Sequence, residues 1–469
     1  MLKKTNINLE KISKFINKIF KLLLILCFSL VFMFISQKNS LLLYILFLIG
    51  IFYFVKKVKI KKFTIFLFSI AFIIRFISIL FFETPIMSDF AVMYNTAIDI
   101  LNGDMSYVIN SKYLNTWGYQ MGHIMYLFYL LKIFNNVIFI KIINCFVTSL
   151  VTVLIYLISR EFSSERSSKI ISLMYCFFPF PLLLNTVLTN QHVPALLVLL
   201  SFYLVIGKKF NNMNDILKYF LVGLLLSFSN ILRPEGIVFI TSLIIYLILL
   251  IKKNNIRIIV VRILVLVITY FTVFNGCSFL LTKTGYSNIG LENKNYLWKF
   301  IVGLNHETNG VYNNIDAVRY SLPGNDDVKI QVLKERIIDD FEDLPRLFLA
   351  KSTILWTKSD LSWSLHHIEG KKLEKLGISI DGSFLKDKLS SLNQHFIYFS
   401  LVLMMIGVIH INRKNINNNV NLINIVILIF FAVYLLVEVM PRYAYSPQLF
   451  VFILASIGLD SVFKYFESR

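Results

Sequence analysis

Long apolar runs, separated by short clusters of lysine, arginine and asparagine, dominate the sequence. Residues 63–82, for example, hold a single charged residue, Arg75. A helix that crosses a membrane needs about 20 mostly apolar residues. The pattern therefore predicts an all-α polytopic membrane protein with about twelve transmembrane helices. We expect these helices at residues 18–36, 40–55, 63–82, 138–159, 168–187, 193–207, 216–232, 236–251, 257–281, 395–411, 420–438 and 446–464.

The composition supports this interpretation. Of the 469 residues, 57% are hydrophobic and 16% are charged, and the mean hydropathy is +0.70. Soluble domains are typically about 45–50% apolar and about 25% charged. An excess of apolar side chains of this size cannot be buried in a soluble core, so ordinary soluble enzymes and nucleic-acid-binding proteins are excluded.

The net charge of +20 is explained by topology. Lysines precede the first predicted span, and further basic clusters occupy segments such as 56–62 and 252–262. Basic loops stay on the cytosolic side of a membrane. We therefore expect a multi-pass protein of the plasma (inner) membrane, with both termini in the cytosol. The lysines before the first span are Lys3, Lys4, Lys11 and Lys14.

The same orientation divides the chain into parts. The stretch 118–134 is apolar enough to cross the membrane, but a crossing there would move every later basic loop outside. We expect it to lie in the interface as an aromatic amphipathic helix. The expected parts are an accessory N-terminal hairpin (1–62), a transmembrane core (63–281) with a large outer loop (83–137), a small α-rich extracytoplasmic domain (282–394) and C-terminal transmembrane helices (395–469).

The four cysteines indicate neither disulfide bonds nor a metal site. All of them fall in predicted spans, and their spacing shows neither a disulfide framework nor a cysteine-based metal motif. They are Cys27, Cys145, Cys176 and Cys277.

Charged residues at the outer membrane edge are the first functional signal. Each charge in or near a membrane is costly and is usually retained for function. The predicted outer hairpins and loops place Asp89, Arg233 and Arg442 at one level, with Glu235, Glu438 and Tyr443 beside the arginines. Arginine suits phosphate oxygens, and a carboxylate can accept a proton from a hydroxyl. This combination suits a reaction on an anionic lipid.

Several short segments, in this order and on this side of the membrane, carry a resemblance to a known family. The segments are Arg75 with Pro85–Phe90, Ala97–Gly103, Gly118–Gln120, Asn144 with Tyr156–Arg160, Leu232–Glu235 and Pro441–Tyr443. With them the chain resembles the GT-C glycosyltransferases over roughly residues 63–465, and it is similar to bacterial protein O-mannosyltransferases and the lipid A aminoarabinose transferase.

The resemblance implies a GT-C-like architecture and an activity. Such an enzyme transfers a sugar from a dolichyl- or polyprenyl-phosphate carrier to a protein, lipid or cell-envelope glycan on the outer membrane face, here as an inverting transferase. It implies that Asp89 is the catalytic base and that Arg442, Arg233 and Tyr443 bind the lipid phosphate. Supporting roles fall to Glu235, Glu438, Arg75 and His192, with Arg75 expected to pair with an acid or a headgroup.

The chain also departs from the family pattern. Phe90 follows Asp89 where several relatives carry a second acid. The first outer loop lacks an Asp-x-Asp motif, so a metal cofactor is not indicated. Asn190, Gln191 and His192 stand where many relatives place glutamate.

Each candidate residue has a simpler alternative. Asp89 is also a suitable cap for a helix that begins near Ala91, and Arg442 a suitable headgroup anchor. Other residues are weaker candidates: a metal site at His366 and His367, an acceptor contact at His306 and Glu307, and interface anchors at Trp356 and Trp363.

Two other classes of function remain open. A transporter or lipid flippase also has many spans, although it usually places its polar groups near the bilayer midplane. A polysaccharide polymerase or ligase that uses a lipid diphosphate usually concentrates arginines in large outer loops, whereas segment 282–394 is balanced in charge.

Overall fold

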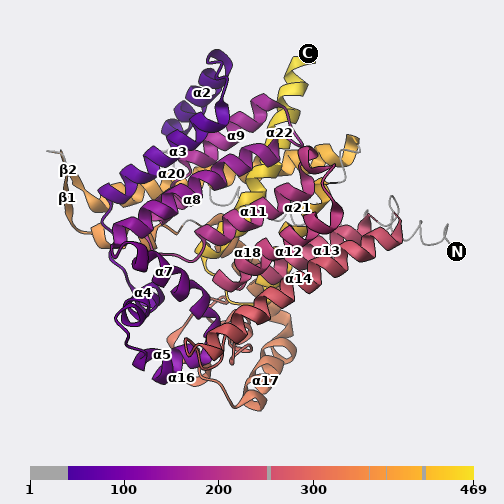
Figure 1. Cartoon of the computed structure of the whole chain (residues 1–469). Coiled ribbons are helices and arrows are strands. Elements are labelled where there is room, and N and C mark those ends of the chain that lie inside the picture. Colours follow the sequence, from indigo (N-terminus) through magenta and orange to yellow (C-terminus); the bar gives the residue numbers. More distant parts are fainter. Residues whose placement is uncertain (1–40, 251–254, 359, 376–377, 415–418, 469) are drawn as a thin grey trace.

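The computed structural model describes residues 41–250, 255–358, 360–375, 378–414 and 419–468. Within this part the chain is almost entirely helical (Figure 1). The predicted span at 18–36, the four N-terminal lysines and Cys27 lie outside the described residues. The all-α prediction is confirmed for the described part.

In the part of the chain that the structure describes, six helical segments are long and apolar enough to cross a membrane, which makes the chain a multi-pass membrane protein. They are α3 (Phe63–Phe81), α8 (Val137–Ser159), α12 (Asp215–Leu232), α14 (Ile256–Lys283), residues Gly382–Ile411 of α20 (Gly382–Lys414), and Pro441–Glu467, which joins η7 (Pro441–Ala444) to α22 (Tyr445–Glu467). Each overlaps a predicted span, although Gly382–Ile411 begins well before the span predicted at 395–411.

A seventh candidate is bent. It joins α9 (Glu165–Phe177) to Pro179–Thr186, which contains α10 (Pro179–Leu183) and η2 (Leu184–Thr186), at an angle of 49°. Pro179 and Pro181 explain the bend, because proline lacks the backbone N–H that a continuous helix needs.

Shorter apolar helices occupy the other predicted spans that fall within the described residues. These are α2 (Leu41–Lys57), α11 (His192–Ile206), α13 (Gly236–Leu249) and α21 (Val420–Leu436). Their positions agree with the sequence pattern, while the total of about twelve crossings stays a prediction.

Helix α22 lies at the centre of the bundle, and every residue from Tyr445 to Asp460 is buried. It packs closely against α20. A Cβ atom added to Gly458 would lie 1.8 Å from the carbonyl oxygen of Leu403, so only glycine permits this approach of the two backbones.

The segment between α3 and α8 forms a chain of short helices: α4 (Ser88–Leu101), α5 (Ser106–Asn110), α6 (Lys112–Thr116), η1 (Gly118–Gln120) and α7 (Met121–Ile133). Helix α7 has 13 residues, fewer than the roughly 20 that a crossing needs. A backbone bridge between Trp117 and Asn293 connects this segment to the region after α14.

The region after α14 is α-rich, as expected, but it also contains a small hairpin. Its helices are α15 (Trp298–Gly303), α16 (Asn314–Tyr320), α17 (Asp326–Lys334), the π-helical turn η4 (Glu335–Asp339), η5 (Phe341–Asp343), α18 (Leu344–Thr357), α19 (Ser362–Leu365) and η6 (His366–Ile368). Strands β1 (Lys372–Lys375) and β2 (Ile378–Asp381) pair antiparallel. Helix α20 then begins at Gly382, before the domain boundary expected at residue 394.

These short helices gather at one end of the bundle, and the C-terminus lies at the other (Figure 1). We call the first the Asp89 end, after a residue in the first turn of α4. We call the second the Ser163 end, after the loop between α8 and α9.

Candidate functional site

The site is built around the chain that enters α22 at the Asp89 end. After α21, residues 437–440 run extended, because Pro441 cannot continue a helical backbone pattern. The backbone N–H of Glu438 donates to the carbonyl of Lys299 (2.8 Å), and that of Val439 donates to the carbonyl of Gly310 (2.9 Å). These bonds attach the segment to the loop around α15 and fix the direction of the Glu438 side chain.

Glu438 contacts both Lys299 and Tyr443. Its side chain is 3% exposed, pairs with the Lys299 ammonium group and accepts a hydrogen bond from the Tyr443 hydroxyl (3.4 Å). Burial alone would lower the pKa of Lys299, but Tyr443 and Glu438 outweigh burial and raise it. The sequence analysis predicted Glu438 and missed Lys299, which lies in an unremarked short helix about 140 residues away along the chain.

Arg233 and Glu235 form a second pair in the tight hairpin between α12 and α13. Arg233 Nε donates to Glu235 Oε1 (2.5 Å), and Arg233 Nη1 donates to Asn190 Oδ1 (2.8 Å). The other oxygen of Glu235 accepts from the Ser446 hydroxyl in α22 (2.6 Å). Glu235 therefore holds Arg233, as predicted, and also ties the hairpin to α22.

Arg442 differs from Arg233 because aromatic rings surround it. Its guanidinium carbon lies 4.1 Å from the ring centre of Trp363, 5.6 Å from that of Phe90 and 5.7 Å from that of Tyr443. Its Nη1 atom is buried and has no hydrogen-bond partner. A buried donor without a partner costs about 1–3 kcal/mol, and an anion placed there would recover that cost.

Asp89 lies in the first turn of α4, at the edge of this cluster. The helix begins at Ser88, earlier than the start near Ala91 that the sequence suggested. Met87 occupies the capping position and there is no side-chain cap bond, so the alternative role of Asp89 as a cap is wrong. Ser88 has φ 54°, a left-handed conformation that costs a residue other than glycine about 1–2 kcal/mol. Such strain is typical of functional sites. The Asp89 side chain next to it is exposed.

Two tyrosines connect Asp89 to the other charges. Burial is the main cause that raises the pKa of Tyr119 to about 12; Lys299 lowers it, and Tyr443 and Asp89 raise it further. Burial and then Asp89 raise the pKa of Tyr113. Asp89 and Lys299 therefore both lie within electrostatic range of Tyr119. The sequence analysis missed both tyrosines, which carry no motif.

Phe90 gives a direct contact between the first outer loop and Arg442. Its ring lies 5.4 Å from that of Trp363, edge to face, and both rings contact the Arg442 guanidinium. Trp363, predicted as an interface anchor, thus also contacts the Arg442 guanidinium. Trp356 is 4% exposed and stacks on Phe431, so it belongs to the core and is not an interface anchor.

The remaining predicted residues lie deeper. Arg75 is fully buried in α3 and donates to the Ala71 carbonyl and the Thr152 hydroxyl, both at 3.1 Å. Its partner was expected to be an acid or a headgroup; among the described residues it instead donates to a carbonyl of its own helix and to a hydroxyl of α8. His192 lies 3.0 Å from the Tyr445 hydroxyl through Nδ1 and supports the start of α22.

The other histidine candidates are accounted for locally. Nε2 of His306 lies 2.9 Å from the Arg336 carbonyl, within its own domain. The rings of His366 and His367 are 5.6 Å apart and inclined by 69°. In the part of the chain that the structure describes, no three histidine, cysteine or acidic side chains come together as a metal site.

The fold and this cluster define a helical multi-pass membrane protein with a charged, aromatic-lined site at one end of its bundle. No protein-family model and no curated protein matches the chain. Among solved structures, it is similar to the crystal structure of ArnT from Cupriavidus metallidurans bound to undecaprenyl phosphate. The identity is 12% and the TM-score 0.38, over 86% of this chain and 78% of that chain. With so distant a similarity, the function has to be argued from the site itself.

Proposed function

We propose that the chain is a GT-C-type membrane glycosyltransferase that takes its sugar from a polyprenyl-phosphate carrier. The observation that carries the proposal is the unpartnered, buried Nη1 of Arg442, held by Trp363 and Phe90 next to the exposed Asp89. Transfer from a phosphate leaving group to a hydroxyl needs a donor for the phosphate and a base for the hydroxyl, and the Arg442 guanidinium and the Asp89 carboxylate have the chemistry for these two roles.

The charges of the site suit a monophosphate. Arg233 is paired with Glu235, and Lys299 is paired with Glu438. Arg442 is the cation of the cluster that has a buried donor without a partner. A polyprenyl monophosphate would receive that donor, while its hydrocarbon tail stays in the membrane.

The proposed reaction is a single displacement. The acceptor hydroxyl gives its proton to the Asp89 carboxylate and forms the new bond to the sugar's anomeric carbon. The bond from that carbon to the phosphate oxygen breaks at the same time, and its electron pair goes to the phosphate beside Arg442. Attack opposite to the leaving group inverts the anomeric centre. The growing negative charge on phosphate strengthens its contact with Arg442 in the transition state.

The donor can be tested with purified, full-length protein in lipid nanodiscs. Polyprenyl-monophosphate-linked sugars should be consumed without a gradient or added nucleotide, with release of polyprenyl monophosphate. UDP- and GDP-linked sugars should give no product in a preparation free of carrier lipid. Turnover of a nucleotide sugar alone, or consumption of the lipid-linked sugars only across a gradient, would contradict the proposal.

The proposal also places the Asp89 end outside the cell and both termini in the cytosol. In a chain whose own cysteines are replaced, single cysteines at the exposed Asn110 and Asn325 should react with an impermeant thiol reagent in intact cells. A cysteine at the exposed Asn212, between α11 and α12, should stay unlabelled. The reverse pattern would contradict both the orientation and an outward-facing active site.

A further inference from the structure

Two neighbouring cavities lie at the Ser163 end, on the opposite side of the bundle from the candidate active site. The first has a volume of about 460 Å³ and is lined by Lys56, Arg166 and Lys169, with Glu165 and Val55. We call it the first basic cavity. The second, with a volume of about 300 Å³, includes Lys61, Lys62, Arg160 and the same Glu165 in its lining. We call it the second basic cavity.

The charge balance of both cavities favours an anion. Each has three basic side chains and shares one acid, Glu165. Glu165 is paired with Lys169 (2.7 Å) and lies 3.8 Å from Arg160, while Arg166 pairs with Glu467 (3.3 Å). Six cations against these two acids leave a surplus of four positive charges, divided between the two cavities by Glu165.

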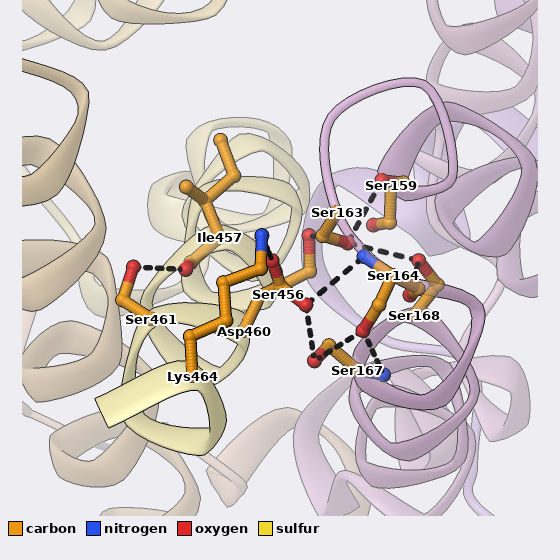
Figure 2. Close-up of polar contacts among 10 residues, drawn as sticks. All are labelled: Ser159, Ser163, Ser164, Ser167, Ser168, Ser456, Ile457, Asp460, Ser461 and Lys464. Carbon is orange, nitrogen blue, oxygen red and sulfur yellow. Dashed lines mark hydrogen bonds and ion pairs between the residues drawn. The ribbon is translucent and has the colours of Figure 1, made fainter. Parts of the chain in front are cut away.

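The wall that carries Arg166 and Lys169 is held firmly in place (Figure 2). Asp460 of α22 accepts hydrogen bonds from the Ser164 backbone N–H (3.1 Å) and the Ser167 hydroxyl (3.3 Å), at the first turn of α9. The Ser163 hydroxyl adds a bond to the Ser456 hydroxyl (3.0 Å). The basic side chains of α9 therefore project from a turn that is fixed against the central helix.

Helix α2 presents an exposed apolar surface along which lipid acyl chains could lie. Four large apolar side chains of α2 are 55–64% exposed and follow one another at intervals of three or four residues, so they form one stripe. The stripe leads to Lys56, which lines the first basic cavity. Its members are Leu43, Leu46, Ile49 and Tyr53.

We propose that the two basic cavities bind the headgroup of an anionic phospholipid with two phosphates, such as cardiolipin, while its acyl chains lie along the α2 stripe. Basic pockets between transmembrane helices on the cytoplasmic side are suited to such headgroups. Two adjacent cavities on either side of one acid match two linked phosphates. The apolar stripe distinguishes a lipid from free inorganic phosphate, which has nothing to bind there.

The proposal can be tested by native mass spectrometry on the full-length protein in detergent, titrated separately with cardiolipin, phosphatidylglycerol and phosphatidylethanolamine. Cardiolipin should bind at least about fivefold more tightly than phosphatidylglycerol, and phosphatidylethanolamine should bind weakest. The double variant Lys56→Gln/Lys61→Gln should weaken cardiolipin binding about tenfold or more, since it removes one cation from each cavity.

Two further variants distinguish a specific site from general effects of charge or folding. Lys208→Gln/Lys209→Gln removes the same charge in the loop after α11, at the same end of the bundle but outside both cavities, and should leave cardiolipin affinity unchanged. Glu165→Gln should tighten cardiolipin binding, because it removes the negative charge that both cavities share. A gain of affinity is not a result that damage to the fold would produce.

Several results would overturn the proposal: equal affinity for cardiolipin and phosphatidylethanolamine, equal loss in the control double variant, or no change in the Lys56→Gln/Lys61→Gln protein. Displacement of cardiolipin by inorganic phosphate alone would show a site for a free anion and would also overturn it. The measurement does not use turnover, so its result is independent of the proposed glycosyltransferase activity.

Discussion

The two ends of the central helix α22 differ in whether the buried charged groups there have hydrogen-bond partners. At the Ser163 end, Asp460 accepts bonds from the Ser164 N–H and the Ser167 hydroxyl and pairs with Lys464 at 2.5 Å (Figure 2). At the Asp89 end, Arg442 keeps a buried nitrogen without a partner, and Asp89 remains exposed beside it.

This difference indicates that the network around Asp460 is structural, whereas the cluster around Arg442 is suited to bind a ligand. A satisfied buried network fixes one arrangement of helices, whereas each unsatisfied buried group needs an explanation. Among the residues drawn around Asp460, the buried atom without a partner is the neutral hydroxyl of Ser159. In the cluster around Arg442, a buried atom without a partner belongs to a charged guanidinium, for which a missing partner is more costly. Variants at the two ends should therefore fail differently.

The largest effect is expected from Asp89→Asn. Asparagine keeps the size of the side chain but cannot take the acceptor's proton, so turnover should fall about 10²–10⁴-fold. Membrane insertion and polyprenyl monophosphate binding should be preserved. The matched control is Asp99→Asn in the same helix, which should keep turnover near wild type. Near wild-type transfer by the Asp89→Asn protein would show that Asp89 is not the base.

A smaller but clear loss is expected from Arg442→Lys. A lysine keeps the charge but cannot reproduce the planar, stacked guanidinium with its free donor, so affinity for polyprenyl monophosphate should fall roughly tenfold or more. Arg166→Lys is the matched control, because Arg166 also stacks on a ring, Phe463 at 4.0 Å, but at the Ser163 end. Equal losses in the two variants, measured by native mass spectrometry, would contradict the assignment of the site to the Asp89 end.

Breaking the hydrogen-bond network around Asp460 should change the stability of the protein and leave ligand binding unchanged. Asp460→Asn removes the charge that holds the first turn of α9 against α22 and should lower the free energy of unfolding by about 1–3 kcal/mol. Affinity for polyprenyl monophosphate should stay at its wild-type value. The measurement is denaturant unfolding in detergent, with binding measured on the same sample. A selective loss of lipid-phosphate binding without destabilisation would mean that the two ends are not distinct.

The smallest effect concerns Lys351 in α18, which is 1% exposed and donates to the carbonyls of Gly303 and Leu435 (2.7 Å to the latter). Burial lowers its pKa from 10.5 to about 7. Between these two values the unfolded chain binds more protons than the folded one, so stability should rise with pH, by at most about 1.4 kcal/mol per pH unit. Denaturant unfolding at pH 7 and 9 checks this. Lys351→Met should reduce the rise, and an unchanged rise would exclude Lys351 as its source.

Sequence reasoning predicted the described helices well, because an apolar run of nearly 20 residues has few other structures available. It also selected the charges that meet at the Asp89 end. Arg233, Glu235, Glu438, Arg442 and Tyr443 come together there, although they are far apart along the chain. The predicted position of these residues at the membrane edge was sufficient to group them, because charged side chains in a membrane protein are mostly found at the membrane edges.

Other parts of the site depend on tertiary contacts that no local pattern records. Lys299 was one basic residue among many in a charge-balanced segment, and only the backbone bonds between residues 438–439 and the α15 loop bring it to Glu438. Trp363 resembled any interfacial tryptophan until Phe90 and Arg442 were placed against it. For Arg75 the sequence analysis expected an acid or a headgroup as partner, whereas Ala71 and Thr152 provide acceptors without a charge.

The most direct test of the central claim is to map where the lipid phosphate binds. A polyprenyl monophosphate with a photoreactive group next to its phosphate should be crosslinked to the purified protein, and the labelled peptides identified by mass spectrometry. We predict labelling of the residues around Arg442, namely Phe90, Trp363 and Tyr443, and loss of that labelling in the Arg442→Lys protein. Labelling confined to the Ser163 end, around Lys56 and Lys169, would contradict the account.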